Sequence, residues 1–212
     1  MRIGFYGDSF CHEIENPHSR LYKYNTYIKL LKQYYDAEII NLGVGGSGYW
    51  DIILSQFNLN NLPDVAIFCW SDFDRLYHPS VRNITRSTAL QKGFKNYLDR
   101  LCGGTFLNFN VWKAAKLYFK HLSDHNKNYK ECQAALFYFD EKVLSKTNTK
   151  IIHMWSFEHT VGIHDWKNGS TIMPALSNFA FEGNWTSYDA NHLGNQEKNN
   201  QIFELIKEEI DK

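Results

Sequence analysis

The sequence predicts an α/β fold built on a parallel, doubly wound sheet. Short apolar segments typical of buried strands alternate along the chain with amphipathic segments typical of helices. Several of the strand-like segments run directly into turns rich in Gly, Ser and Asp, where open α/β sheets place their ligands. The 212 residues, 43% of them hydrophobic, are enough for one domain (residues 1–212) with a full core.

The first seventy residues carry the alternation most clearly. The segments expected to be buried strands are residues 2–6, 37–42 and 65–70. Between them, Asn25 is expected to cap a helix whose Ile28, Leu31 and Tyr35 share one face, and residues 49–57 are expected to form a short helix.

The middle of the chain departs from this rhythm and predicts a helical insertion at about residues 80–148, packed on the sheet. Its expected helices are residues 88–101, 111–121 and 129–144. A strand at 151–155 and a long loop at 156–188 follow, and loops of that length tend to be functional. Asn195 is expected to cap the last helix, which has a buried stripe of Ile202, Leu205, Ile206 and Ile210.

Composition excludes several classes of function. The formal net charge is zero, which argues against a nucleic acid or an anionic membrane as partner. No segment predicts a membrane span or a secretion signal, so we expect a cytoplasmic protein. The four cysteines are dispersed, which argues against disulfides and structural zinc: Cys11, Cys69, Cys102 and Cys132. The oligomeric state stays open.

Ser9 is the candidate nucleophile. It follows an apolar strand and a Gly7 that permits a tight turn. A serine hydroxyl needs a base to accept its proton, and that base needs a third group to orient it. Asp189 and His192 have a suitable spacing, since on a turn the carboxylate can reach the imidazole Nδ1 while Nε2 faces outward. Acyl transfer also needs donors to an oxyanion, for which the amides of Ser9 and Gly46 are candidates, with Ser71 as a third donor.

These segments carry a family resemblance. Residues 7–10 (GDSF), 41–46 (NLGVGG) and 189–193 (DANHL) resemble three sequence blocks of the GDSL/SGNH hydrolase superfamily, in family order and across nearly the whole chain. The resemblance implies a flavodoxin-like three-layer α/β/α sandwich. It also implies a carboxylic ester hydrolase with a catalytic triad of Ser9, His192 and Asp189 and an oxyanion glycine at Gly46, without cofactor or metal.

The third block of the family is divergent in this chain. The family usually has Gly-x-Asn-Asp at this strand end, whereas residues 69–72 here are CWSD, so Ser71 stands in place of the Asn that donates to the oxyanion. Loss of one such donor typically lowers turnover by ~10²–10³. Asp8, Trp70 and Asp72 flank these positions and are expected to contact substrate.

The expected reaction is hydrolysis of short-chain acyl esters, O-acetyl esters above all, through an acyl-enzyme, on a small-molecule or glycan substrate. Five tryptophans lie in or near the expected cleft loops, where rings can stack on a sugar: Trp50, Trp70, Trp155, Trp166 and Trp185. One alternative is a weakly active or inactive carbohydrate-binding domain that has kept the fold.

A second alternative is a dinucleotide-binding oxidoreductase, because residues 43–48 have the pattern GxGxxG after a strand. Asp72 lies near the position at which this fingerprint has an acidic residue. A metal site is not expected, since the nearest cluster lacks the spacing of a known metal motif: His153, Glu158, His159, His164 and Asp165.

Overall fold

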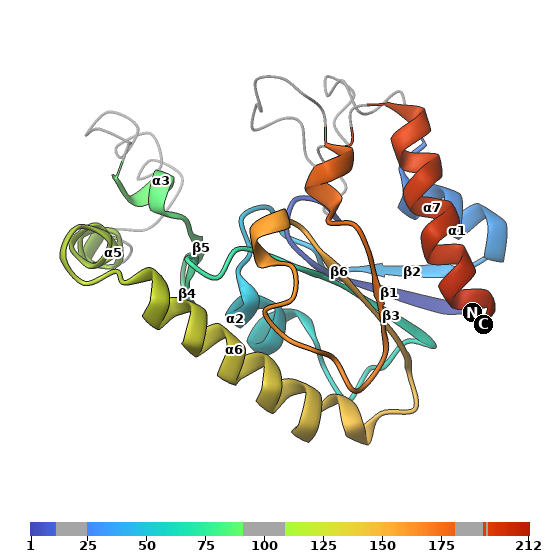
Figure 1. The fold of residues 1–212 in the computed structure, drawn as a ribbon, viewed down its shortest axis with the longest axis horizontal. Coiled ribbons are helices and arrows are strands. Elements are labelled where there is room, and N and C mark those ends of the chain that lie inside the picture. Colours follow the sequence, from blue (N-terminus) through green and yellow to red (C-terminus); the bar gives the residue numbers. More distant parts are fainter. Residues whose placement is uncertain (12–24, 91–108, 181–192, 194) are drawn as a thin grey trace.

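Five parallel strands form the central sheet of the computed structural model, which describes residues 1–11, 25–90, 109–180, 193 and 195–212 (Figure 1). In spatial order the strands are β2 (Glu38–Asn41), β1 (Arg2–Gly7), β3 (Val65–Trp70), β6 (Lys150–Trp155) and β7 (Ser170–Ile172). Every neighbouring pair is parallel. The first strand therefore lies inside the sheet with the second outside it, which is the flavodoxin-like order.

Helices cover both faces of this sheet. Alternate residues of β3 point to opposite faces, so Val65 and Ile67 join one core cluster while Phe68 and Trp70 join the other. The first cluster packs under α1 (Tyr27–Tyr35) and α7 (Gln196–Asp211). The second packs under α2 (Tyr49–Asp51), the π-helical turn η2 (Ile52–Gln56) and α6 (His125–Lys142). The predicted three-layer α/β/α architecture with a parallel sheet is confirmed.

The helix caps show how closely the sequence predicts helix ends. Asn195 caps α7 as expected, its side-chain oxygen accepting from Lys198 N at 2.9 Å. The cap of α1 is Thr26 rather than the predicted Asn25, with Thr26 Oγ1 accepting from Lys29 N at 3.3 Å. Either side chain can cap a helix, so the prediction is wrong by one residue.

Three expectations about strands need correction. The predicted buried strand at 37–42 is β2, an edge strand of half-exposed residues, because none of the described strands lies outside it. The predicted long loop contains strand β7, which pairs with β6 at the other edge of the sheet and lies between the 3₁₀ turns η5 (Glu158–Thr160) and η6 (Leu176–Phe179). No strand was expected between residues 71 and 150, but a hairpin of β4 (Leu76–His78) and β5 (Arg82–Ile84) precedes the inserted helices.

The inserted helices divide into two groups. Through Cys132, Leu136 and Phe139, α6 packs on the sheet, as expected, and ends in the 3₁₀ turn η4 (Leu144–Lys146). In contrast, α3 (Arg86–Leu90) and α5 (Phe109–His121) share a separate small core around Phe119 with the hairpin. Residues 91–101 of the predicted helix 88–101 lie outside the described residues.

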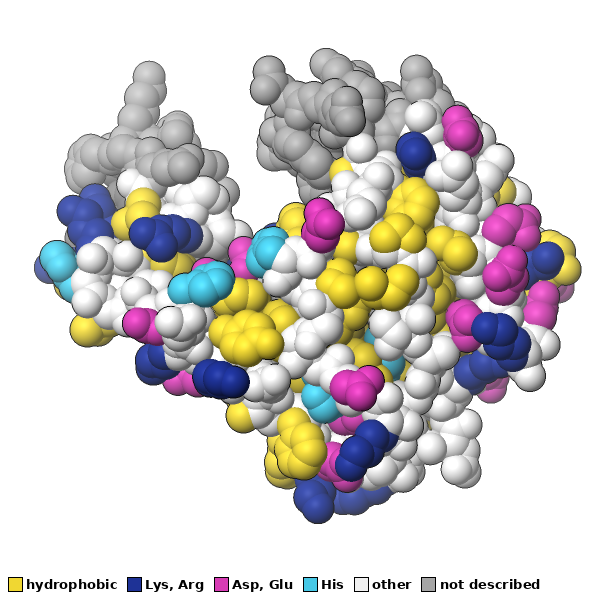
Figure 2. Space-filling model, in the orientation of Figure 1, with side chains coloured by type: hydrophobic (Ala, Val, Ile, Leu, Met, Phe, Trp, Pro, Cys, Tyr) yellow, Lys and Arg dark blue, Asp and Glu magenta, His cyan; other side chains and the backbone are white. Residues whose placement is uncertain are grey.

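Charged side chains are scattered over the face seen in Figure 2, where acidic and basic groups alternate, in keeping with the net charge of zero. Within the described segments, no helix combines the length and the apolar character that a membrane crossing requires.

A buried hydrogen-bonded chain connects the sheet to α6. Trp70 Nε1 donates to His153 Nδ1 at 3.0 Å, so the proton of the neutral imidazole lies on Nε2, which donates to Asn168 O at 2.9 Å. The Asn168 side chain in turn donates to Asp140 Oδ1 at 2.8 Å. Burial lowers the pKa of His153 from 6.5 to about 3. Burial would raise the pKa of Asp140, but its donors outweigh that effect and lower it.

Because His153 is buried and neutral, we expect the stability of the fold to decrease in acid. Between pH 6.5 and about 3, the unfolded chain binds a proton at His153 that the folded chain does not, so the free energy of unfolding falls as the pH drops through this window. The His153→Gln variant keeps an acceptor for Trp70 and a donor for Asn168 but cannot titrate. We expect its slope of stability against pH to be shallower by up to about 1.4 kcal/mol per pH unit.

Urea unfolding at half-unit steps from pH 4 to 7 measures these slopes. His121→Gln, on the exposed end of α5, is the matched control and should keep the wild-type slope. Equal slopes for wild type and His153→Gln would contradict the assignment of a neutral, buried His153.

Candidate functional site

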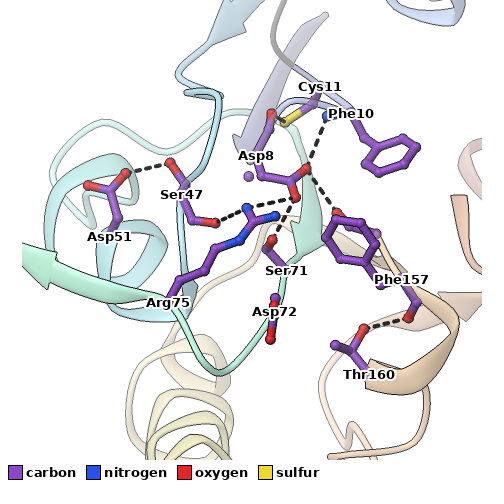
Figure 3. Close-up of polar contacts among 12 residues, drawn as sticks. Asp8, Phe10, Cys11, Ser47, Asp51, Ser71, Asp72, Arg75, Phe157 and Thr160 are labelled. Atoms are coloured by element: carbon purple, nitrogen blue, oxygen red, sulfur yellow. Dashed lines mark hydrogen bonds and ion pairs between the residues drawn. The ribbon is translucent and has the colours of Figure 1, made fainter. Parts of the chain in front are cut away.

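The carboxyl ends of β1, β3 and β6 meet because the strands are parallel and adjacent. The first residue after each of them is polar: Asp8, Ser71 and Ser156. Both serines bind Asp8: Ser71 Oγ donates to Asp8 Oδ2 at 2.6 Å and Ser156 Oγ donates to Asp8 Oδ1 at 3.0 Å. The centre of the site is thus the carboxylate of Asp8 (Figure 3).

The carboxylate of Asp8 is buried and accepts hydrogen bonds from other residues of the protein. Its side chain is 0% exposed, and two further donors complete its coordination: Phe10 N to Oδ1 at 3.0 Å and Arg75 Nη1 to Oδ2 at 3.2 Å. Each carboxylate oxygen therefore accepts two hydrogen bonds. Asp8 was expected to contact substrate, but all four of these acceptor positions are occupied by protein donors, so we reassign it to holding the site together.

Ser9 lies on a tight turn directly after β1. Cys11 N donates to Asp8 O at 3.3 Å, which closes the turn around Ser9. The neighbouring Cys11 is buried, and burial together with the adjacent Cys69 thiol raises the pKa of Cys11 well above its usual value. Because Cys11 is 0% exposed, its thiol offers no surface to a substrate, so Ser9 stays the candidate nucleophile.

The glycine-rich segment after β2 packs against this turn. Ser47 N donates to Val44 O at 3.0 Å, and Gly46 has a φ of 83°, as the third residue of a type II turn requires. Val44 N donates to Gly7 O at 3.0 Å, which ties the turn to the end of β1. A Cβ added to Gly45 would lie 4.0 Å from Ser9 Cβ, so the predicted nucleophile and the glycine turn are neighbours.

The other two glycines of the GxGxxG pattern have a packing role. A Cβ at Gly43 would lie 2.5 Å from Cys11 Sγ, and one at Gly48 would lie 3.0 Å from Arg75 Cβ. Neither position has room for a side chain. The pattern is therefore explained by the close packing of this loop on the protein, without a dinucleotide.

Gln56 is a site residue that sequence reasoning missed. It lies in the π-helical turn η2, is 1% exposed, and pairs with both backbone groups of Gly7. Gly7 N donates to Gln56 Oε1 at 2.6 Å, and Gln56 Nε2 donates to Gly7 O at 3.1 Å. Gln56 Nε2 also donates to Ser47 Oγ at 3.0 Å, while Ser47 Oγ donates to Asp51 Oδ2 at 2.6 Å. The amide thus joins the end of β1 to the glycine turn.

Arg75 and Ser156 were also missed. Arg75 lies beyond β3, and its Nη1 donates both to Asp8 Oδ2 and, at 2.9 Å, to Ser47 O (Figure 3). Ser156 stands immediately after a correctly predicted strand, so the strand-end rule that selected Ser9 and Ser71 had enough information to select it. Nothing comparable in the local sequence marks Arg75.

The remaining predicted contacts differ in exposure. Trp70 is 1% exposed and stacks on Phe68 and Trp166 in the core, so its ring offers no surface to a substrate. Asp72 is partly exposed, accepts from Asp74 N at 3.0 Å and lies 3.7 Å from His159 Nε2. Of the other tryptophans, Trp155 is buried and Trp50 is exposed.

Asp189, His192 and Trp185 lie outside the described residues. Leu193, the neighbour of His192, is described, and it is buried in the same core cluster as Phe10, the neighbour of Ser9. Asn199 Nδ2 donates to Leu193 O at 3.4 Å and Tyr27 N donates to Asn199 Oδ1 at 3.0 Å. Tyr27 OH then donates to Phe10 O at 3.0 Å. A continuous chain of contacts thus links the neighbours of the two predicted catalytic residues.

Among the residues that the structure describes, no group of three or more His, Cys, Asp or Glu side chains is placed to hold a metal ion. His164, which belongs to the cluster that was considered from its sequence and not expected to bind a metal, pairs with Asp140 through Nε2 at 2.9 Å.

No protein-family model matches this chain, and no curated protein matches it. Among solved structures, it is similar to a protein of Parabacteroides merdae ATCC 43184 described as a "putative GDSL-like lipase". The two share 18% sequence identity with a TM-score of 0.32, over 97% of this chain and 75% of that chain.

Gln56 yields a prediction about stability. Gln56→Leu keeps the approximate volume but leaves Gly7 N without its partner in a buried site, and it removes a donor from Ser47 and Asp51. We expect a loss of about 3 kcal/mol in the free energy of unfolding, measured by chemical denaturation. Gln201→Leu, on the exposed face of α7, is the matched control and should change stability by no more than about 0.5 kcal/mol. Equal effects of both substitutions would contradict the role assigned to Gln56.

Proposed function

We propose that this protein is a serine esterase that hydrolyses short-chain acyl esters, O-acetyl esters above all. The observation that carries the proposal is the position of Ser9. It lies on a tight turn at the carboxyl end of β1, beside the glycine turn at residues 44–47. The order of the GDSF, NLGVGG and DANHL segments along the chain supports the same activity.

His192 is proposed as the general base, with Asp189 holding its imidazole. The support is indirect: the contacts through Asn199 and Tyr27 connect Leu193 with Phe10, so the chain that follows His192 is anchored to the chain that follows Ser9. A general base must come within hydrogen-bond reach of the nucleophile. The contacts between Leu193 and Phe10 support the proposal because these residues are the sequence neighbours of His192 and Ser9.

In the proposed reaction, Ser9 Oγ attacks the acyl carbon while His192 takes its proton. The carbonyl oxygen becomes an oxyanion and accepts hydrogen bonds from the backbone N–H groups of Ser9 and Gly46. His192 then protonates the departing alcohol, which leaves an acyl-enzyme. Water, deprotonated by His192, attacks that ester and releases the acid and free Ser9.

Ser71 was expected to be a third oxyanion donor. Its single hydroxyl proton is directed at Asp8 Oδ2 at 2.6 Å, so donation to an oxyanion requires this bond to be given up. We propose that Ser71 contributes to the oxyanion only through such a switch. The same observation favours the alternative of a weakly active or inactive domain that binds carbohydrate on the same fold.

The proposed substrates are small-molecule or glycan esters. Trp50 and His159 are exposed and Asp72 is partly exposed, and such side chains can stack on a sugar ring or bind its hydroxyl groups. Asp8 and Trp70, both buried, are not included among the proposed substrate contacts.

Hydrolysis of 4-nitrophenyl acetate and butyrate by the purified protein tests the activity. We expect faster turnover of acetate and its loss in Ser9→Ala, because this substitution removes the nucleophile. Ser145→Ala, exposed and near the amino end of β6, should turn over at the wild-type rate. Equal background rates for wild type and Ser9→Ala would contradict the esterase, and labelling of Ser9 by a fluorophosphonate then separates a selective enzyme from an inactive binding domain.

A pH profile tests the base. We expect kcat/KM to fall at acid pH, because a protonated imidazole of His192 cannot accept the Ser9 proton, and to level off at higher pH. His192→Ala should lower kcat by at least ~10³ and flatten the profile. A profile that is unchanged in His192→Ala would assign the base to another residue.

A further inference from the structure

Asp8 and Arg75 form an ion pair that is largely removed from water. Their side chains are 0% and 12% exposed, and Arg75 Nη1 lies 3.2 Å from Asp8 Oδ2. Taking two charges out of water carries a desolvation penalty that the attraction between them often fails to exceed, so such a pair is weak evidence of a purely stabilising role. The role of this ion pair is therefore sought in the segments that it connects.

The same nitrogen that pairs with Asp8 also holds the glycine turn. Nη1 donates to Ser47 O at 2.9 Å, and Ser47 closes the turn in which Gly46 is the third residue. One nitrogen therefore bridges two segments: the turn that carries Ser9 and the turn that carries the Gly46 amide.

Arg75 is itself fixed from two sides. The space beside Gly48 is filled by Arg75, whose Cβ and backbone oxygen would lie 3.0 and 3.3 Å from a Cβ added there. The ring of Phe157, which follows β6 by two residues, lies 5.2 Å from the guanidinium carbon. A side chain bounded in this way can hold a backbone carbonyl in one position.

We propose that Arg75 is a positioning residue for the oxyanion site: by bridging Asp8 and Ser47 O it holds the Gly46 amide in register with Ser9. The inference rests on the proposed esterase function. Oxyanion donors act only when they lie about 2.7–3.1 Å from the developing charge, and a misplacement of about 1 Å can lower the rate ~10²-fold. This role of Arg75 would matter in this chain, because Ser71 replaces the Asn that usually donates to the oxyanion and the backbone donors must act without it.

Arginine suits this task better than lysine. Its planar guanidinium presents donors in a fixed fork, whereas a lysine ammonium is a mobile point charge on a flexible stem. Arg75→Lys therefore keeps the charge beside Asp8 and weakens the geometry. Arg75→Met removes both but leaves the Asp8 carboxylate buried without a cation. The double variant Asp8→Asn/Arg75→Met removes the two charges together and avoids that penalty.

The experiment measures kcat and KM for 4-nitrophenyl acetate, with active sites titrated by a fluorophosphonate. It also measures the Kd of butylboronic acid, which forms a tetrahedral adduct with a reactive serine and so reports on the oxyanion site. Arg86→Met, an exposed arginine on α3, is the matched control. Thermal unfolding of each variant verifies that it is folded.

We expect kcat per titrated site to fall ~10²-fold in Arg75→Met and in the double variant, and by a smaller factor in Arg75→Lys. KM should change less than about threefold, because the oxyanion forms only in the transition state, and the boronate should lose affinity in parallel with kcat. Arg86→Met should match wild type. A merely structural role would lower the number of active sites but leave kcat per site and boronate affinity unchanged.

Two failures can be told apart. If wild type shows Ser9-dependent turnover and the folded Arg75 variants keep its kcat per site and boronate affinity, the positioning role is overturned and the esterase stands. If wild type shows neither Ser9-dependent turnover nor fluorophosphonate labelling of Ser9, the proposed function is overturned and this inference with it.

Discussion

The coordination of the Asp8 carboxylate is the constraint on which the rest of the site depends. A charged group without exposure to water must be satisfied by protein donors, and here four donors come from three segments of the chain. Two are the residues that follow β3 and β6. Because adjacent parallel strands end at the same edge of the sheet, the fold brings Ser71 and Ser156 within hydrogen-bond distance of Asp8. The turn that carries Ser9 follows directly from Asp8 and inherits its position.

Much of the fold follows from patterns that act locally. β1, β3 and β6 agree with the predicted strands to within a residue, because each is a continuous apolar run between polar turns. β7 and the β4–β5 hairpin have strands of only three residues, too short to show a period, and their existence depends on neighbours elsewhere in the chain. Such elements are set by tertiary contacts and leave no local pattern to read.

The same distinction applies to the site. Position after a strand identified Ser9 and Ser71, but it did not show which way a side chain points. Trp70 was predicted to meet substrate, although its alternation with Phe68 along β3 indicates that both rings lie on the face covered by α6. Asp8 was predicted to do the same, and its burial follows from donors far away in sequence. Arg75, beyond the strand end, is connected to the site only by the folded structure.

The polar character of this strand-end cluster needs an explanation that stability alone does not provide. Apolar side chains of similar volume in place of Asp8 and Arg75 would pack the strand ends without a desolvation penalty. They would offer nothing to the carbonyl of Ser47 or to the amide of Phe10, and the two turns would be free to move relative to each other. Hydrogen bonds fix direction as well as distance, whereas apolar contacts fix neither closely. A buried polar network at this edge is therefore what a site needs if backbone N–H groups on two separate turns must point at one atom.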